Sequence, residues 1–136
     1  MERTPGKHLL LILSRELAAN VSTPMIIIDP DGTLIYFNEA SEPILGETFA
    51  HTGELRSREW AERWHPQRLD GVPFTVDDSP LGKTMIRHRP ASAAMVITGT
   101  DGVRRTITIA SYPLLAHDDD FVGAVAIFWE SGDETA

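Results

Sequence analysis

The last long apolar stretch of the chain, residues 121–129, constrains the fold most strongly. Its sequence, FVGAVAIFW, is apolar at both sets of alternating positions. Successive side chains of a strand point to opposite faces of a sheet, so a strand with this pattern is buried on both faces. Helices from the middle of the chain can cover one face. The other face needs an amphipathic N-terminal helix or a second subunit.

Period-2 patterns and turn residues predict four further strands. The sequence DPDG at 29–32 is a turn between two of them, in which proline presets φ and glycine accepts a positive φ. The sequence GTDG at 99–102 is a hairpin turn, and an acidic connection at 117–120 leads into the last strand. The predicted strands are 25–29, 33–37, 93–98, 104–112 and 121–129.

Four helices are predicted, at 7–21, 39–45, 47–65 and 80–88. Asn38 is a good N-cap for the second helix, and Gly46 stands where a C-cap needs a left-handed residue. Pro43 lacks the amide that would bond back to Glu39, so we expect that helix to be short or distorted. The first helix places five aliphatic residues at helical spacing, opposite charged residues; they are Leu9, Leu10, Leu13, Leu17 and Val21.

Together these elements predict one α+β domain. The chain has 136 residues, of which 42% are hydrophobic, and this suffices for one core but not for two full domains. We assign residues 1–22 to the N-terminal helix, which covers the sheet or forms a dimer. Residues 23–130 form the folded domain, and 131–136 form a solvated tail.

Charge and cysteine content exclude several classes of function. Twelve Lys and Arg against twenty Asp and Glu give a net charge of −8, and the arginines are scattered, which argues against nucleic acid as a partner. Without cysteine there are no disulfides, thiolate metal sites or thiol nucleophiles. The apolar run at 9–13 is too short to span a bilayer and has no small-residue cleavage site, so we expect neither membrane anchor nor signal peptide, and a cytoplasmic location.

Three stretches in the right order resemble the PAS domain, a family of sensor and dimerisation modules. They are IIIDPDGTLIYFNEASEPILG at 26–46, LDGVPFTVDDSPLGKTM at 69–85, and the two strands TDGVRRTITIASYPL and FVGAVAIF near the C-terminus. The resemblance spans roughly 24–130. It implies a five-stranded antiparallel sheet in the order 2-1-5-4-3, short helices across one face, and a ligand pocket between them.

Apolar residues are expected to line this pocket. Two interpretations remain open: a site for an apolar molecule such as a fatty acid or small hydrophobic metabolite, or a filled core, which is favoured because a domain of this size needs one anyway. The predicted pocket residues are Trp64, Met85, Ile86, Ile97, Ile107, Ile109, Val125 and Ile127.

The resemblance also allows known cofactors of the family to be weighed. Flavin-binding relatives use a reactive cysteine and side-chain amides on the inner sheet face, whereas this chain has no cysteine and places Ile97, Ile107 and Val125 where the amides would stand. An unpaired polar edge of a flavin would cost about 1–3 kcal/mol per lost hydrogen bond. Haem-binding relatives ligate iron through a histidine near His88, with Met95 able to approach from the far side. The polar surroundings of His88 instead indicate a solvated helix end.

No pattern in the sequence predicts an enzyme or a metal site. The consecutive carboxylates at 118–120 are more typical of a solvated turn than of a metal site, and Asp77 and Asp78 are explained by the N-terminus of the helix that follows. Serine, histidine and aspartate occur, but not in nucleophile-elbow or metal-histidine spacings.

We therefore predict a non-catalytic sensor or interaction module that acts through dimer packing. The five aliphatics of the N-terminal helix are the predicted dimer contact, and a signalling effector bound in trans is a possible further partner. Three alternatives stay open: a ligand-free structural dimerisation domain, a haem-binding gas or redox sensor, and a small α+β enzyme.

Overall fold

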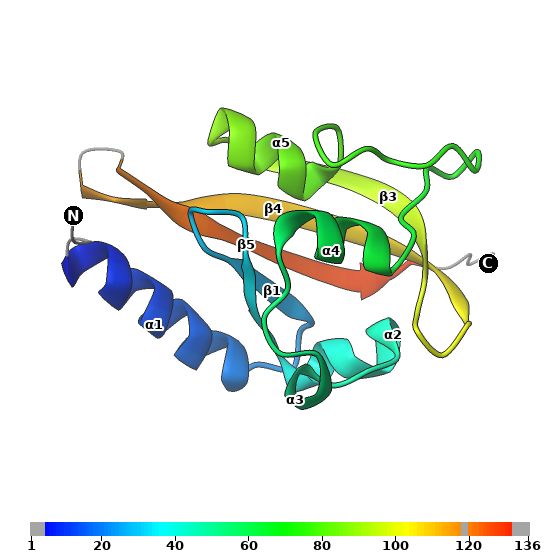
Figure 1. Ribbon diagram of the computed structural model, residues 1–136, viewed down its shortest axis with the longest axis horizontal. Coiled ribbons are helices and arrows are strands. Elements are labelled where there is room, and N and C mark those ends of the chain that lie inside the picture. The colour runs from blue at the N-terminus through cyan, green and yellow to red at the C-terminus, as the bar shows by residue number, and fades with distance from the viewer. Residues whose placement is uncertain (1–4, 118–119, 132–136) are drawn as a thin grey trace.

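The computed structural model describes residues 5–117 and 120–131, with side chains from residue 9 onward. A twisted sheet forms its centre, and a helix, α1 (Pro5–Ala19), lies apart from the shorter helices (Figure 1). Among these residues no helix is long and apolar enough to cross a membrane. The predicted α+β class is confirmed.

The sheet has the order β2-β1-β5-β4-β3, with every neighbouring pair antiparallel, which confirms the prediction. β4 runs past the predicted end at residue 112, because Pro113 stays paired with Ala124 although it cannot donate to the ladder. The strands are β1 (Met25–Ile28), β2 (Leu34–Phe37), β3 (Ala91–Thr98), β4 (Arg104–Ala116) and β5 (Asp120–Glu130).

The predicted helix 39–45 is a 3-10 turn, η1 (Glu39–Ser41), followed by α2 (Glu42–Leu45). Because α2 begins at Glu42, Pro43 lies in its first turn, where a missing amide costs no hydrogen bond. Gly46 ends the helix with φ 80°, as its predicted C-cap role requires.

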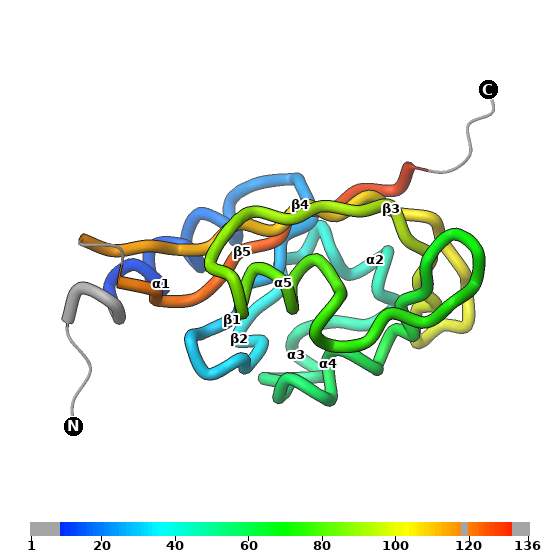
Figure 2. The backbone as a smooth tube through the Cα atoms, turned by 90° about the horizontal axis from the view of Figure 1, so that it is seen from above, coloured from blue at the N-terminus to red at the C-terminus, as the bar shows by residue number. Residues whose placement is uncertain are grey.

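The predicted helix 47–65 is two helices, α3 (Phe49–Thr52) and α4 (Ser57–Arg63). They are separate because the backbone of Leu55 exchanges hydrogen bonds with Leu34 and so leaves the helical path. α5 (Pro80–Arg87) begins at a serine N-cap and a proline in its first turn. Figure 2 shows α3, α4 and α5 together on one side of β3 and β4.

Two apolar clusters lie on the two faces of the sheet. The larger one lies between the sheet and helices α2, α4 and α5, and it contains Ile26, Phe37 and Phe128. In the smaller one, Leu11 and Ala18 of α1 pack against the opposite face. The N-terminal helix therefore covers the second face of β1 and β5, one of the two possibilities that their apolar pattern leaves open.

Asn38 occupies the N-cap position predicted for it, and its backbone carbonyl accepts from Ser41 N. Its side chain makes no cap hydrogen bond to the helix that follows. Oδ1 accepts from Met25 N (2.9 Å) and from the Ser41 hydroxyl (2.8 Å). Nδ2 donates to Ala18 O (2.9 Å) and Thr23 O (2.8 Å), which ties the end of α1 to the sheet.

Candidate functional site

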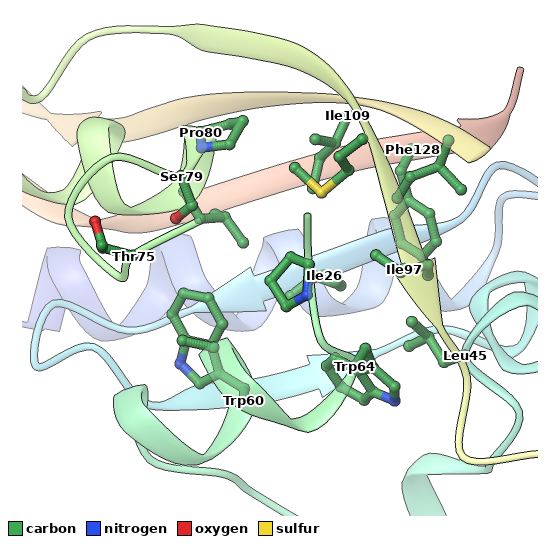
Figure 3. Close-up of a pocket in the computed structure, with 15 residues that line it drawn as sticks. Ile26, Leu45, Trp60, Trp64, Thr75, Ser79, Pro80, Ile97, Ile109 and Phe128 are labelled. Carbon is green, nitrogen blue, oxygen red and sulfur yellow. The ribbon is translucent and has the colours of Figure 1, made fainter. Parts of the chain in front are cut away.

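A cavity of about 70 Å³ lies between the inner face of the sheet and the helices (Figure 3). This is enough for several water-sized groups, whereas pockets for drug-sized ligands measure about 300–1,000 Å³. Almost all of its wall is carbon. The lining residues are Ile26, Leu45, Trp60, Ala61, Trp64, Pro66, Thr75, Ser79, Pro80, Leu81, Met95, Ile97, Ile107, Ile109 and Phe128.

Trp60 and Trp64 form the wall on the side of α4. They are four residues apart, so their side chains lie on the same side of the chain. Trp60 Nε1 donates to Gly32 O and Trp64 Nε1 donates to Glu47 Oε2, both at 2.9 Å. Both partners lie outside the cavity wall, so each indole presents its carbon atoms to the cavity.

An ion pair fixes the end of α4 next to Trp64. Arg63 Nε and Nη2 donate to the two carboxylate oxygens of Glu47, both at 2.7 Å. The hydrogen bond to Glu47 raises the pKa of Arg63. Because the pair is bidentate, it sets the orientation of Glu47, which in turn holds the indole of Trp64.

The loop that precedes α5 forms the opposite wall. Ser79 Oγ accepts from Gly82 N (3.1 Å) and donates to Val76 O (3.0 Å). Gly82 itself lies against Val76 O, where a Cβ would have no room. Figure 3 shows Thr75 and Ser79 on this wall, across the cavity from Trp60.

Arg68 and Asp78 hold the loop in place from its outer side. Arg68 Nη2 donates to Asp78 Oδ2 (2.8 Å), and its guanidinium lies 4.5 Å from the centre of the Phe74 ring. Desolvation opposes ionisation of Asp78, but the hydrogen bonds from Thr75 and Arg68 outweigh it and lower the pKa of this carboxyl. The loop wall is therefore ordered by polar contacts that leave the cavity itself apolar.

The chemistry available inside the cavity is limited to apolar contact. Its lining contains no ionisable side chain. Within 5–117 and 120–131, every buried side-chain nitrogen and oxygen has a hydrogen-bond partner, and no group of three acidic or histidine side chains could hold a metal ion. The site can bind carbon surface, and apart from the two indole N–H groups its polar side-chain groups are the hydroxyls of Thr75 and Ser79.

The structure brings four of the predicted pocket residues together, namely Trp64, Ile97, Ile107 and Ile109. Met85 packs partly buried against the same core without lining the cavity. Ile86 points away and is 59% exposed. The remaining two residues, on β5, need a correction.

Val125 and Ile127 lie on the opposite face of the sheet, against α1. Ile109 pairs with Phe128 and Ser111 with Ala126, so the inner face of β5 carries Phe128 and Ala126. A shift of one residue in register moves a whole side-chain set to the other face. A strand that is apolar on both faces gives no signal against that shift, and for this reason sequence reasoning missed Phe128.

Other lining residues were also missed. Trp60 lies four residues before Trp64 in the sequence. Because residues four apart share a helix face, that spacing could have placed Trp60 on the wall as well. Leu45, Pro66 and Thr75 come from segments without periodicity, so no sequence signal places them beside the sheet.

The predicted dimer residues on α1 separate into two groups. Leu9, Leu13 and Leu17 are exposed, on the side of α1 that faces away from Leu11 and Ala18. Leu10 and Val21 are half-buried, and Val21 packs against the sheet. Ile12, which was not predicted, is also exposed and adjoins the first group.

The histidine and carboxylate candidates lie away from the cavity. His88 is exposed, ends α5 with φ 57°, and stacks on Phe121 with ring centroids 3.9 Å apart. Met95 lines the cavity, but His88 does not. Asp118 and Asp119 lie outside the described residues.

No protein-family model matches the chain. No curated protein matches it either. Solved structures do match it closely in three dimensions. The PAS domain of the fruit-fly ELK potassium channel superposes with a TM-score of 0.67 at 8% identity, covering 90% of this chain and 98% of that one.

Two bacterial domains are similar to the chain over comparable lengths. The LOV domain of the EL346 blue-light activated histidine kinase from Erythrobacter litoralis has a TM-score of 0.64 and 18% identity, over 84% of this chain and 100% of that one. The PAS domain of BvgS from Bordetella pertussis has a TM-score of 0.59 and 14% identity, over 90% and 86%. At these identities the likeness concerns the fold.

Proposed function

The chain has the PAS fold, and on this premise we propose that it is a non-catalytic sensor module that binds a small apolar molecule and responds through dimer packing. The observation that carries the proposal is the carbon-lined cavity of about 70 Å³ inside the core. A cavity without ionisable or unpaired polar groups suits neither catalysis nor a flavin edge. His88 is exposed, stacks on Phe121 and does not line the cavity, which argues against a haem ligand at this position.

The strands β1 and β5 supply a physical route from the cavity to α1. Ile26 and Phe128 line the cavity, whereas their neighbours Met25, Ile27 and Ile127 pack on the α1 side. A molecule that displaces the inner side chains therefore also shifts the backbone of β1 and β5, on which α1 packs. Because packed cores respond by discrete shifts, a small displacement can change how α1 is presented.

The exposed side of α1 is the proposed contact between two copies. Four large aliphatic side chains on one helix face would be a liability in a monomer; they are Leu9, Ile12, Leu13 and Leu17, each between 47% and 58% exposed. A cytoplasmic location and an effector protein bound in trans belong to the same proposal.

The second candidate function is a dimerisation domain without a ligand. The small cavity volume favours it, because a few packing defects of this size occur in ordinary cores. Native mass spectrometry of gently purified protein, followed by denaturing extraction, distinguishes the two. A stoichiometric co-purified molecule of apolar character supports the sensor. Protein whose mass stays that of the bare chain, and whose Trp60 and Trp64 fluorescence is unchanged by apolar probes, supports the structural domain.

A further inference from the structure

A surface groove between α4 and the loop before α5 adjoins the cavity. The groove has a volume of about 480 Å³ and shares Ala61 and Thr75 with the cavity wall. Its other lining residues are Arg58, Glu62, Phe74, Val76 and Asp77. The two hollows therefore adjoin at a residue of α4 and a residue of the loop, and we infer that this junction is the mouth of the cavity.

Ala61 lies at this junction and has a small side chain. It is half-buried on α4, between Trp60 on the cavity side and Glu62 on the groove side. A larger side chain at this position would fill the passage, while the exposed face of α4 would be unaffected.

The cavity wall offers few hydrogen-bonding groups to a polar end of a ligand. Both indole N–H groups donate elsewhere, and the Ser79 hydroxyl is held between Val76 O and Gly82 N. The Thr75 hydroxyl accepts from Asp78 N at 3.3 Å, and it belongs to an exposed residue that the cavity shares with the groove, so it lies at the mouth. Moving an unpaired polar end from water into the cavity costs free energy. Such an end is therefore expected to stay at the mouth, in contact with water.

The charges at the mouth determine which polar end groups of a ligand are favoured. Arg58 is the single cation of the groove wall, and it lies 4.0 Å from Glu62, one turn away. Asp77 adds a second carboxylate. The groove wall therefore carries one positive and two negative groups, in a chain whose net charge is −8.

Building on the proposed apolar-ligand function, we infer that the site takes an amphiphile whose hydrocarbon part enters past Ala61 and whose uncharged or cationic end stays beside Glu62 and Asp77. Carboxylate-ended molecules are disfavoured. This narrows the expected ligand class, because fatty acids should bind with lower affinity than alcohols and amines of the same chain length.

Three eight-carbon probes test the inference: octan-1-ol, octylamine and octanoate. In a Trp129→Phe background, the remaining tryptophans, Trp60 and Trp64, both line the cavity, so their fluorescence reports its occupancy. We expect octylamine to bind at least about threefold more tightly than octanoate, with a difference that shrinks as salt is added. The double variant Glu62→Gln/Asp77→Asn leaves Arg58 as the only charge of the groove wall, so it should abolish or reverse the preference for octylamine while octan-1-ol still binds.

The mouth is tested with Ala61→Trp, and with Ala61→Leu as a smaller obstruction if the first does not fold. Each should weaken binding of all three probes by about tenfold or more. Ala50→Leu, on the exposed side of α3, is the matched control and should bind as the parent does.

The outcomes separate the inference from the proposed function. If octan-1-ol leaves the fluorescence of Trp60 and Trp64 unchanged, both fail. If octan-1-ol binds but octanoate binds as tightly as octylamine, or if Ala61→Leu folds and binds normally, the inference about the mouth is wrong and the apolar site remains.

Discussion

Asn38 is the residue that joins α1 to the rest of the domain. It is 1% exposed, and its amide bonds to the backbone at the end of α1, at Thr23 and at the start of β1. A buried polar group is stabilising only while all its partners are present. The orientation of α1 therefore depends on this side chain as well as on the packing of Leu11 and Ala18 against the sheet.

Asn38→Ala should reduce the free energy of unfolding by about 2–4 kcal/mol, because Ala18 O and Thr23 O lose a buried donor. Trypsin cleavage after Arg15 in α1 should also accelerate as the helix loosens. Urea unfolding and a proteolysis time course measure the two effects. Asn20→Ala removes only an exposed amide bonded within α1 and should cost less than about 0.5 kcal/mol. Equal losses from both variants would contradict the assigned role.

Asp101 gives the domain a pH-dependent contribution to stability. The backbone N–H of Val103 (3.1 Å) and the Arg105 guanidinium (3.3 Å) lower the pKa of this carboxyl below its ordinary value of 3.8. A carboxyl whose folded pKa is depressed stabilises the fold above its unfolded pKa and loses that contribution as the pH falls through the folded pKa.

Asp101→Asn should therefore be less stable than the parent at neutral pH, and the difference should shrink as the pH falls below 3.8. Thermal unfolding at a series of pH values measures this difference. Asp31→Asn, at the Asp-Gly turn between β1 and β2, is the control. A difference between Asp101→Asn and the parent that stays constant down to about pH 2 would contradict the explanation.

At the scale of single residues, sequence reasoning succeeded where local chemistry decides. Gly46 was placed correctly because a left-handed C-cap needs glycine. Asn38 occupies its predicted N-cap position, but the partners of its side chain lie up to 20 residues away, and capping preference carries no information about them. Pro43 looked disruptive only because the helix start was placed too early.

Among the elements, α5 and the loop before it form one packed unit through Gly82. In the interior of a helix, replacing glycine by alanine normally stabilises by about 0.5–1 kcal/mol. Here a Cβ would collide with Val76 O, so the usual sign should reverse.

Gly82→Ala should destabilise the domain by about 1–3 kcal/mol and should weaken octan-1-ol binding, because the displaced loop forms part of the cavity wall. Urea unfolding and tryptophan fluorescence measure the two effects. Lys83→Ala, on the same helix turn, is the control with an expected change within about 0.5 kcal/mol. If Gly82→Ala were more stable than the parent, the loop would be able to move away from the added Cβ without loss of stability, and the explanation would be wrong.

The strand order followed from the resemblance to the PAS domain and the helix-covered face from the sequence pattern, but the cavity wall followed only in part. The three isoleucines on β3 and β4 were found because those strands alternate. Val125 and Ile127 were placed on the wrong face because β5 is apolar on both. The loop residues of the wall depend on tertiary packing, which leaves no periodic signal.

On the scale of the whole molecule, α1 has one side on the sheet and an apolar side without a partner among the described residues. Leu13→Lys and Leu17→Lys should each weaken the proposed dimer by about tenfold or more, because burying a leucine contributes about 1.5–3 kcal/mol. Light scattering after size exclusion, over a range of concentrations, measures this. Leu69→Lys, in an exposed loop, is the control. A parent chain that is monomeric at about 100 µM would contradict the dimer.

The central claim is that occupancy of the cavity and association through α1 are coupled. Thermodynamic linkage requires that a molecule which binds monomer and dimer differently must change the dimer dissociation constant. The most direct test is sedimentation equilibrium with and without octan-1-ol, with Ala61→Leu as the uncoupled control. The account predicts a change of about fivefold or more in the dissociation constant of the parent and little change in the variant. An unchanged constant in the parent, while the fluorescence of Trp60 and Trp64 reports a filled cavity, would contradict it.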